Sequence, residues 1–229
     1  MRRALDLFSG SGSVTKALED CGFDVVSVDV SNAYSTPTHH CCVWEYDEHR
    51  YEPDHFDLVW ASPPCETFST ARRLCVPRHM TEEERIDDQI CIGLPLVARA
   101  IAIMQHHPDA LHVLENPHSG DLKNYVTGND FPWCSVVDYC RYGDNSSGLL
   151  FPRKRTALWS NRDMCSAGFE PLLCHGGLCG TVSRGRHLAT VCRNRSSALG
   201  MAGAYGGTSK CVDKYRVPAK LVHRVADCT

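Results

Sequence analysis

The chain has 229 residues, of which 43% are hydrophobic and 22% are charged. These values are ordinary for a soluble globular protein and exclude a disordered chain or a collagen-like repeat. No apolar run reaches the roughly 18 residues that a membrane span needs. Because Asp6 interrupts the apolar stretch after Arg2 and Arg3, we expect no signal peptide. The sequence therefore predicts an intracellular protein without a membrane anchor.

The net charge of −3 hides an uneven distribution. Residues 1–140 contain 10 Lys+Arg and 22 Asp+Glu, which gives −12, whereas residues 141–229 contain 14 and 5, which gives +9. The basic second part suggests contact with a polyanion, although an accident of solvated surface would give the same count. The 14 cysteines are too few for a disulfide scaffold, so we expect reduced thiols.

Hydrophobic runs and turn residues predict alternating strands and helices along residues 3–61. Residues 3–8 predict a strand that ends in a Gly/Ser turn, and residues 13–20 predict a helix that Gly22 closes. Further strands are expected at residues 24–30 and 56–61, where Pro63 and Pro64 stop the second of them. Residues 31–53 are irregular and polar.

A long helix is expected to begin at Thr81, because Thr81 and Glu84 have the spacing of a capping box. One apolar face at helical spacing predicts burial of Ile86, Ile90, Leu94, Val97, Ile101 and Met104. Pro95 predicts a kink or break near Gly93.

The rest of the chain predicts strands and a closing helix. Strands are expected at residues 111–115, 135–142 and 156–160, and the helix at residues 217–226. The alternation favours an α/β fold with a doubly wound, mostly parallel sheet. Three parts are expected: a catalytic domain at 1–162, a small loop-rich subdomain at 163–204, and a closing segment at 205–229 that returns to the catalytic domain.

The first candidate site is the sequence DLFSGSGS at residues 6–13. A strand that runs through Gly10-x-Gly12 into a helix places backbone N–H groups beside a bound cofactor. Thr15 stands where a dinucleotide fingerprint has its third glycine, which disfavours a dinucleotide-dependent oxidoreductase. Asp29 ends the next strand and suits a ribose, or it caps a turn. Asp47 is a weaker candidate for the adenine, with Glu45 and Glu48 as alternatives.

The second candidate site is the sequence ASPPCETFS at residues 61–69. Two prolines at a strand end stiffen the loop and aim the thiol of Cys65, as a nucleophile requires. A buried structural cysteine is the alternative. Two further candidate sequences are Glu115-Asn116-Pro117, at a strand end, and FPRKRTALWS at residues 151–160, a basic segment that leads into a strand. The structural alternatives are a turn at the end of the strand for the first and a solvated basic turn for the second.

These four sequences, in this order, resemble the cytosine-C5 DNA methyltransferases, and they look most like the small enzymes of large DNA viruses such as iridoviruses. The resemblance implies a Rossmann-like fold that binds S-adenosylmethionine, with Cys65 as nucleophile, Glu115 on cytosine N3 and Arg155 on cytosine O2. It departs from the family at Pro117, where valine is usual, and at Arg153 and Ala157 in the basic motif. The implied cofactor-binding residues are Leu7, Phe8, Ser9, Gly10, Ser11, Gly12, Asp29, Asp47 and Pro63.

The expected partner is double-stranded DNA with the target cytosine flipped out of the helix. The expected DNA contacts are Arg153, Lys154, Arg184 and Arg186. We expect a monomer, in the host nucleus or cytoplasm if the protein is viral. Two alternatives stay open: the same chemistry on RNA cytosine, and a catalytically inactive DNA-binding member of the family.

A group of soft metal ligands lies in the basic part of the chain: Cys165, Cys174, His175, Cys179, His187 and Cys192. Such residues could hold a zinc ion. Their spacing lacks the paired C-x-x-C units that make a zinc site recognisable, and a chain with 14 Cys and 12 His forms such groups by composition. The sequence alone therefore predicts no metal.

Overall fold

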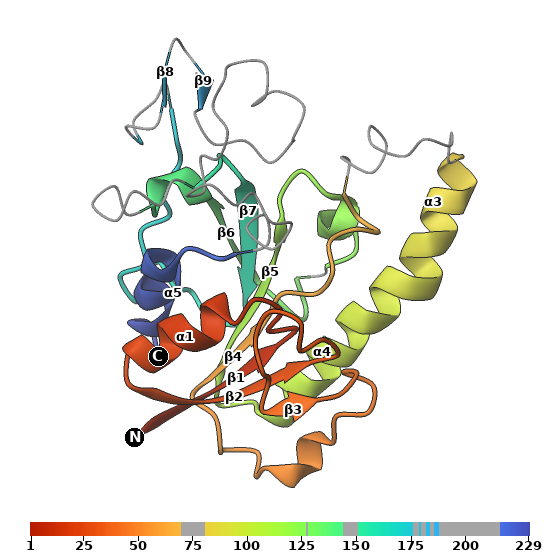
Figure 1. Cartoon of the computed structure of the whole chain (residues 1–229), viewed down its shortest axis with the longest axis vertical. Helices are drawn as coiled ribbons and strands as arrows, with labels where there is room; N and C mark the ends of the chain where they lie inside the picture. The colour runs from red at the N-terminus through yellow and green to blue at the C-terminus, as the bar shows by residue number, and fades with distance from the viewer. Residues whose placement is uncertain are drawn as a thin grey trace.

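The protein is an α/β fold built on one seven-stranded sheet, as the computed structural model shows (Figure 1). The model describes residues 1–69, 81–126, 128–143, 151–175, 179, 182–183, 186–187 and 216–229. The strand order is β3-β2-β1-β4-β5-β7-β6. The strands are β1 (Arg2–Leu7), β2 (Phe23–Asp29), β3 (His39–His40), β4 (Leu58–Ala61), β5 (Leu111–Pro117), β6 (Trp133–Asp138) and β7 (Arg155–Ser160).

Most strand pairs are parallel, which confirms the predicted doubly wound sheet. Strand β1 pairs in parallel with β2 and β4, β2 with β3, and β4 with β5. Strand β7 runs antiparallel between β5 and β6. The carboxyl ends of β1, β2, β4 and β5 therefore meet at one edge of the sheet.

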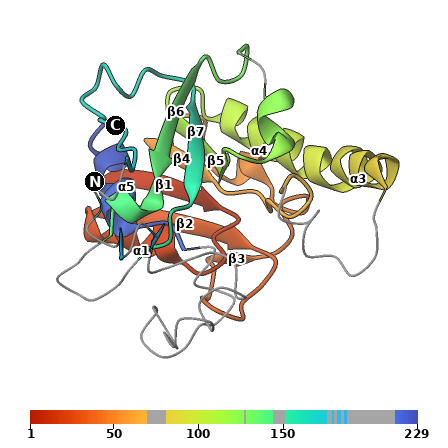
Figure 2. The ribbon, with the colours of Figure 1, turned by 90° about the horizontal axis from the view of Figure 1, so that it is seen from above.

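Helices cover both faces of the sheet (Figures 1 and 2). Helices α1 (Ser13–Asp20) and α5 (Ala219–Ala226) lie on one face, and α4 (Leu94–His106) lies on the other. Helix α3 (Glu82–Asp88) and the π-helical turn η2 (Gln89–Gly93) precede α4. The remaining short elements are η1 (Glu48–Arg50), η3 (Asp121–Asn124), η4 (Tyr139–Arg141) and a separate hairpin of β8 (Val182–Ser183) and β9 (Arg186–His187).

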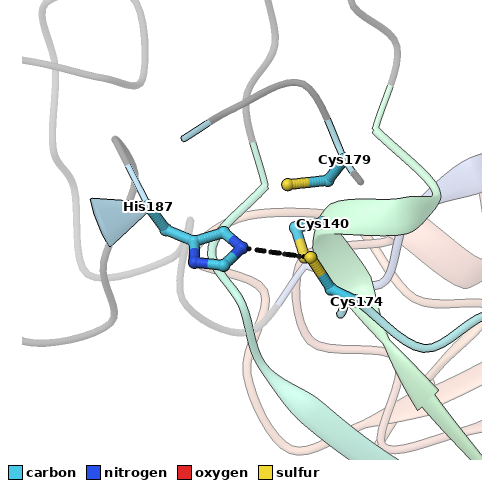
Figure 3. A group of neighbouring side chains, drawn as sticks. All are labelled: Cys140, Cys174, Cys179 and His187. Carbon is cyan, nitrogen blue, oxygen red and sulfur yellow. Dashed lines mark hydrogen bonds between the residues drawn. The ribbon is translucent and has the colours of Figure 1, made fainter. Parts of the chain in front are cut away.

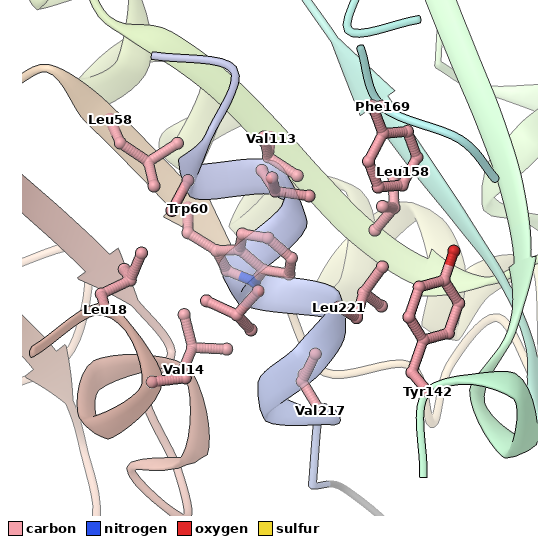
Figure 4. Close-up of a cluster of buried hydrophobic side chains, with 14 of the residues drawn as sticks. Val14, Leu18, Leu58, Trp60, Val113, Tyr142, Leu158, Phe169, Val217 and Leu221 are labelled. Carbon is pink, nitrogen blue, oxygen red and sulfur yellow. The ribbon is translucent and has the colours of Figure 1, made fainter. Parts of the chain in front are cut away.

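Each sheet face has its own hydrophobic core, because neighbouring strand residues point to opposite faces. In β4, Leu58 and Trp60 pack toward α1 and α5, whereas Val59 and Ala61 pack toward α4. Figure 4 shows the first of these cores, in which Trp60 and Leu158 of the sheet and Leu221 of α5 are gathered. The C-terminal helix thus completes the core that the N-terminal strand begins.

The long helical segment differs in part from the sequence prediction. The capping box of Thr81 and Glu84 is present, which confirms the start of the helix. The continuous buried face is wrong at Ile86 and Ile90, which are 37% and 52% exposed. The physical reason for this exposure is the π-helical turn η2, whose hydrogen bonds run from residue i to residue i+5. The wider turn rotates the apolar side of the preceding helix away from the core.

The helix does not break near Gly93, because α3, η2 and α4 follow one another without a gap; the irregularity at this place is the π-helical turn η2, which ends at Gly93. Pro95 lies in the first turn of α4, where its missing N–H leaves no helical hydrogen bond unmade. Gln89 and Gly93 of η2 are buried, whereas Ile86 and Ile90 are exposed. This segment therefore packs one polar and one small residue, Gln89 and Gly93, against the loop that follows β4.

Residues 163–204 fall only partly within the described residues. Met164 and Phe169 pack in the same core as Val217 and Leu221, so the first part of this segment lies on the face of the sheet that α5 covers. Cys192 and Arg184 lie outside the described residues. Among the helices that the structure describes, none has the length and hydropathy to cross a membrane.

Candidate active site

A cavity of about 410 Å³ opens at the carboxyl ends of β1, β2, β4 and β5. Small-molecule sites commonly have volumes of roughly 300–1,000 Å³ and, in open α/β sheets, lie at this edge. Its lining includes Lys154 and Val217 together with residues from these strand ends and from the loops that follow them: Asp6, Phe8, Ser9, Gly10, Ser11, Asp29, Pro63, Cys65 and Glu115.

The turn between β1 and α1 forms one wall of the cavity. Phe8, Gly10 and Gly12 all have positive φ angles, of 61°, 48° and 69°. Such angles are strained for Phe8 but natural for glycine, so the two glycines allow the sharp entry into α1. Asp29, at the end of β2, holds this turn by accepting hydrogen bonds from Gly10 N (2.8 Å) and Ser31 N (2.7 Å).

Two buried polar atoms in this wall have no hydrogen-bond partner. They are Oδ1 of Asp6 and Oγ of Ser9, whose residues are 1% and 7% exposed. Thr15 donates to the other carboxylate oxygen of Asp6 at 2.6 Å. Burial raises the pKa of Asp6 to about 7, against the opposing hydrogen bond from Thr15. An unpaired buried carboxylate oxygen fits a bound ligand that carries positive charge or hydrogen-bond donors.

The predicted cofactor residues divide between the cavity and its surroundings. Those that line it are Phe8, Ser9, Gly10, Ser11, Asp29 and Pro63. Leu7 is fully buried in the core, and Gly12 is the N-cap residue of α1. Asp47 is the N-cap of η1, where it accepts a hydrogen bond from His49 N at 3.1 Å.

The loop that carries Cys65 is fixed from several sides. Asn116 Nδ2 donates to Pro63 O at 3.0 Å, Gln89 Nε2 donates to Thr67 O at 3.2 Å, and Phe68 N donates to Cys65 O at 3.1 Å. These contacts join the loop to β5 and η2. The rigidity that the double proline predicts is therefore reinforced by side chains from two other elements.

Glu115 lies beside Cys65 in the cavity and is 5% exposed. Its Oε1 atom accepts a hydrogen bond from Tyr139 OH at 2.7 Å and one from Lys154 Nζ at 3.3 Å. Burial raises the pKa of the Cys65 thiol, Lys154 opposes this shift, and Glu115 adds to it. Among the residues that the structure describes, Lys154 is therefore the cation whose charge favours the Cys65 thiolate.

Arg155 does not line the cavity. It is the cross-strand partner of Asp138 and donates to both carboxylate oxygens, from Nε at 3.1 Å and from its terminal nitrogen at 3.0 Å. Arg153 lies 3.6 Å from the same carboxylate. Although burial opposes the shift, Arg155 and the Cys174 N–H lower the pKa of Asp138. Only the backbone of Arg186 is described, in β9.

Comparison with known proteins shows the family of the chain. No family model matches the chain. The chain is 34% identical, over 98% of its own length and 99% of the other, to the probable DNA (cytosine-5)-methyltransferase of Frog virus 3 (isolate Goorha). It belongs to the DNA (cytosine-5)-methyltransferase family.

Solved methyltransferase structures resemble this family member more distantly. A Spodoptera frugiperda DNMT2 mutant is 16% identical, with a TM-score of 0.46 over 75% of this chain and 53% of that one. The S. pombe Dnmt2 methyltransferase is 12% identical, with a TM-score of 0.42 over 70% of this chain and 49% of that one. The chain spans about half the length of these two structures.

Three residues of this candidate site, namely Asp6, Asn116 and Tyr139, were not singled out by the sequence. Asp6 could have been found, because a charged residue inside an apolar strand requires a partner or a ligand. Asn116 was part of a predicted motif, but its contact with Pro63 depends on how β4 and β5 pair. Tyr139 reaches Glu115 only through the neighbouring positions of β5, β7 and β6, which no local pattern encodes.

Proposed function

We propose that the chain transfers a methyl group from S-adenosylmethionine to C5 of cytosine in DNA. The observation that carries this proposal is that Cys65, Glu115 and Lys154 line the same cavity as the Gly10 turn and Asp29. One cavity can therefore hold the methyl donor against the nucleophile loop. The membership of the family supports the same reaction.

S-adenosylmethionine supplies an activated methyl group on a positively charged sulfur. The unpaired Oδ1 atom of Asp6 and the unpaired hydroxyl of Ser9 fit its charge and its hydrogen-bonding groups. Asp29 keeps acceptor capacity for the two ribose hydroxyls beyond its two backbone hydrogen bonds. Val217, whose N–H donates to Ser13 Oγ at 3.1 Å, closes this end of the cavity.

The reaction begins once the target cytosine has been flipped out of the helix, since C5 and C6 are otherwise hidden in the stack. The Cys65 thiolate attacks C6, which forms a C6–S bond and places negative charge on the ring. A proton held between Glu115 and cytosine N3 neutralises that charge. C5 then takes the methyl group as the bond from that methyl to the donor sulfur breaks, which leaves S-adenosylhomocysteine. A base removes the C5 proton, and the C6–S bond breaks to restore Cys65.

We assign the cation of this site to Lys154 and not to Arg155. Lys154 contacts Glu115 and favours the Cys65 thiolate, whereas the Arg155 guanidinium is bound to Asp138. Lys154 then takes the role beside the base that the family resemblance gave to Arg155. Arg155 holds the buried carboxylate that anchors β6 to the segment around Cys174.

DNA as the substrate is supported by the basic second part of the chain, with its charge of +9 over residues 141–229. We propose that Arg153, Arg184 and Arg186 contact phosphates and that residues 163–204 read the target sequence. The protein acts as a monomer, in the nucleus or cytoplasm of a host cell.

The test is a methyl-transfer assay with labelled S-adenosylmethionine on matched DNA and RNA, followed by bisulfite mapping of the modified bases. We expect label at C5 of cytosine in DNA, loss of transfer in Cys65→Ala, and normal transfer in the control Cys134→Ala, which changes an exposed cysteine. Transfer to RNA alone would overturn the assignment of the substrate. Transfer by Cys65→Ala would overturn the assignment of the nucleophile.

A further inference from the structure

A second group of reactive side chains lies outside the active-site cavity. Cys140, Cys174, Cys179 and His187 each offer one ligand atom, and all four atoms lie within 4.8 Å of one another. The three cysteines are buried, and Figure 3 shows all four side chains directed toward one point. They come from three elements: η4, the segment from Cys174 to Cys179, and β9.

The distances match a tetrahedral metal ion. Nε2 of His187 lies 3.4 Å from Cys174 Sγ and 3.6 Å from Cys140 Sγ. Bond lengths of about 2.3 Å to sulfur and 2.0–2.1 Å to nitrogen place tetrahedral S and N ligands about 3.5 Å apart, and two S ligands about 3.8 Å apart. The four atoms therefore need shifts of no more than ~1 Å to surround one ion.

We propose that Cys140, Cys174, Cys179 and His187 bind one zinc ion in a closed structural site. Three sulfur ligands and one imidazole are a set that zinc prefers, and four protein ligands leave no open position for catalysis. Cys174 and Cys179 are separated by four residues, within the spacing common in such sites. Binding converts the thiols to thiolates and releases their protons to solvent.

The surrounding contacts prepare the site for a metal. Cys174 N donates to the Asp138 carboxylate at 2.8 Å, and Arg155 holds that carboxylate in place. Cys140 and Cys174 are free thiols, so these two are available as ligands. Cys140 directly follows Tyr139, the residue that donates to Glu115. The ion would thus fasten the β8–β9 hairpin to the end of β6, next to the active site.

The structure also separates the ligands from Cys165 and His175 of the sequence group, whereas Cys192 lies outside the described residues. Cys165 is exposed, with its sulfur 3.8 Å from Ser135 Oγ, and His175 is exposed as well. Cys140, which belongs to the predicted catalytic domain, takes the fourth position. Cys165→Ser is therefore a matched control for substitutions within the site.

The test is metal analysis of the untagged full-length protein, with the apoprotein reloaded with Co²⁺ under reducing conditions. We expect one zinc per chain, and a Co²⁺ spectrum with tetrahedral bands and strong thiolate charge-transfer absorption. Cys179→Ser should weaken the charge-transfer band, whereas Cys165→Ser should leave it unchanged. Zinc below 0.1 per chain together with no thiolate absorption on Co²⁺ loading would overturn the proposal, as would equal weakening by both variants.

A second measurement does not depend on any variant folding. X-ray absorption of the zinc-loaded wild-type chain should give three sulfur neighbours and one nitrogen neighbour, at about 2.3 and 2.0–2.1 Å. A shell of oxygen and nitrogen alone would place the ion elsewhere and contradict the site. Mass spectrometry of the protein as isolated, without reductant, gives the other outcome. If the protein is metal-free and two of these cysteines together lack two mass units, they form a disulfide, which would contradict the zinc site.

Discussion

Gly93 packs so closely against the Cys65 loop that an added methyl group has no room. A Cβ atom there would lie 2.7 Å from Cζ of Phe68 and 2.9 Å from its Cε2, and it would also clash with Oγ1 of Thr67. Both neighbours are buried, at 1% and 8% exposure. Gly93→Ala is therefore expected to displace the loop two and three residues after Cys65.

The sign of the stability change distinguishes packing from helix propensity. Gly93 has helical angles, φ −70° and ψ −52°, so propensity alone predicts that alanine stabilises the chain by roughly 1 kcal/mol. Overpacking in a filled core costs about 1–3 kcal/mol. Because two buried side chains must move, we expect the upper part of that range and a net loss of about 1–2 kcal/mol.

Urea unfolding followed by circular dichroism measures this change directly. The control is Gly128→Ala, since a Cβ atom at Gly128 meets nothing within 4 Å and should change stability by less than about 0.5 kcal/mol. Gly93→Ala should also lower methyl transfer while leaving the affinity for S-adenosylmethionine nearly unchanged. A Gly93→Ala protein more stable than wild type would refute the close packing of η2 on this loop.

Three further predictions follow from the charged groups of the site. Lys154→Met should shift the increase of the methyl-transfer rate with pH to a higher pH, because Lys154 opposes the effect of burial, which raises the pKa of Cys65. Arg155→Met should lower the stability of the fold but leave this pH profile unchanged, because Arg155 is bound to Asp138. Asp6→Asn should flatten the pH dependence of cofactor binding measured by calorimetry, since the positively charged ligand favours the ionised carboxylate and affinity should rise through about pH 7 in wild type. In wild type the free energy of unfolding should fall between about pH 4 and 7, because the folded chain keeps a proton on Asp6 that the unfolded chain releases from pH 3.8 upward. Asp6→Asn should remove this fall.

Local patterns in the sequence predicted most of the sheet and the two residues at the centre of the site. The β1 turn, the double proline and the Glu-Asn-Pro sequence each follow a strand, and the carboxyl ends of parallel strands meet at one edge. Cys65 and Glu115 were therefore accessible to sequence reasoning once the strands were recognised.

What the sequence did not reveal depends on register and on distant contacts. Lys154 and Arg155 are adjacent, and neighbouring residues of an extended chain point in opposite directions. Only the pairing of β7 with β6 decides that Arg155 meets Asp138 while Lys154 faces Glu115. The apolar spacing did not reveal the π-helical turn, so it predicted burial of Ile90, which is exposed. The proposed fourth metal ligand, Cys140, lies in a different predicted domain from the other three.

The central claim is that Cys65 forms a covalent bond with cytosine C6, and one measurement tests it directly. DNA containing 5-fluorocytosine should trap the protein in the presence of S-adenosylmethionine, because fluorine cannot leave C5 as a proton does. Mass spectrometry of the digested adduct should place the DNA on the peptide that contains Cys65, with no adduct in Cys65→Ala. An adduct on another of the 14 cysteines, or methyl transfer without any adduct, would contradict the account.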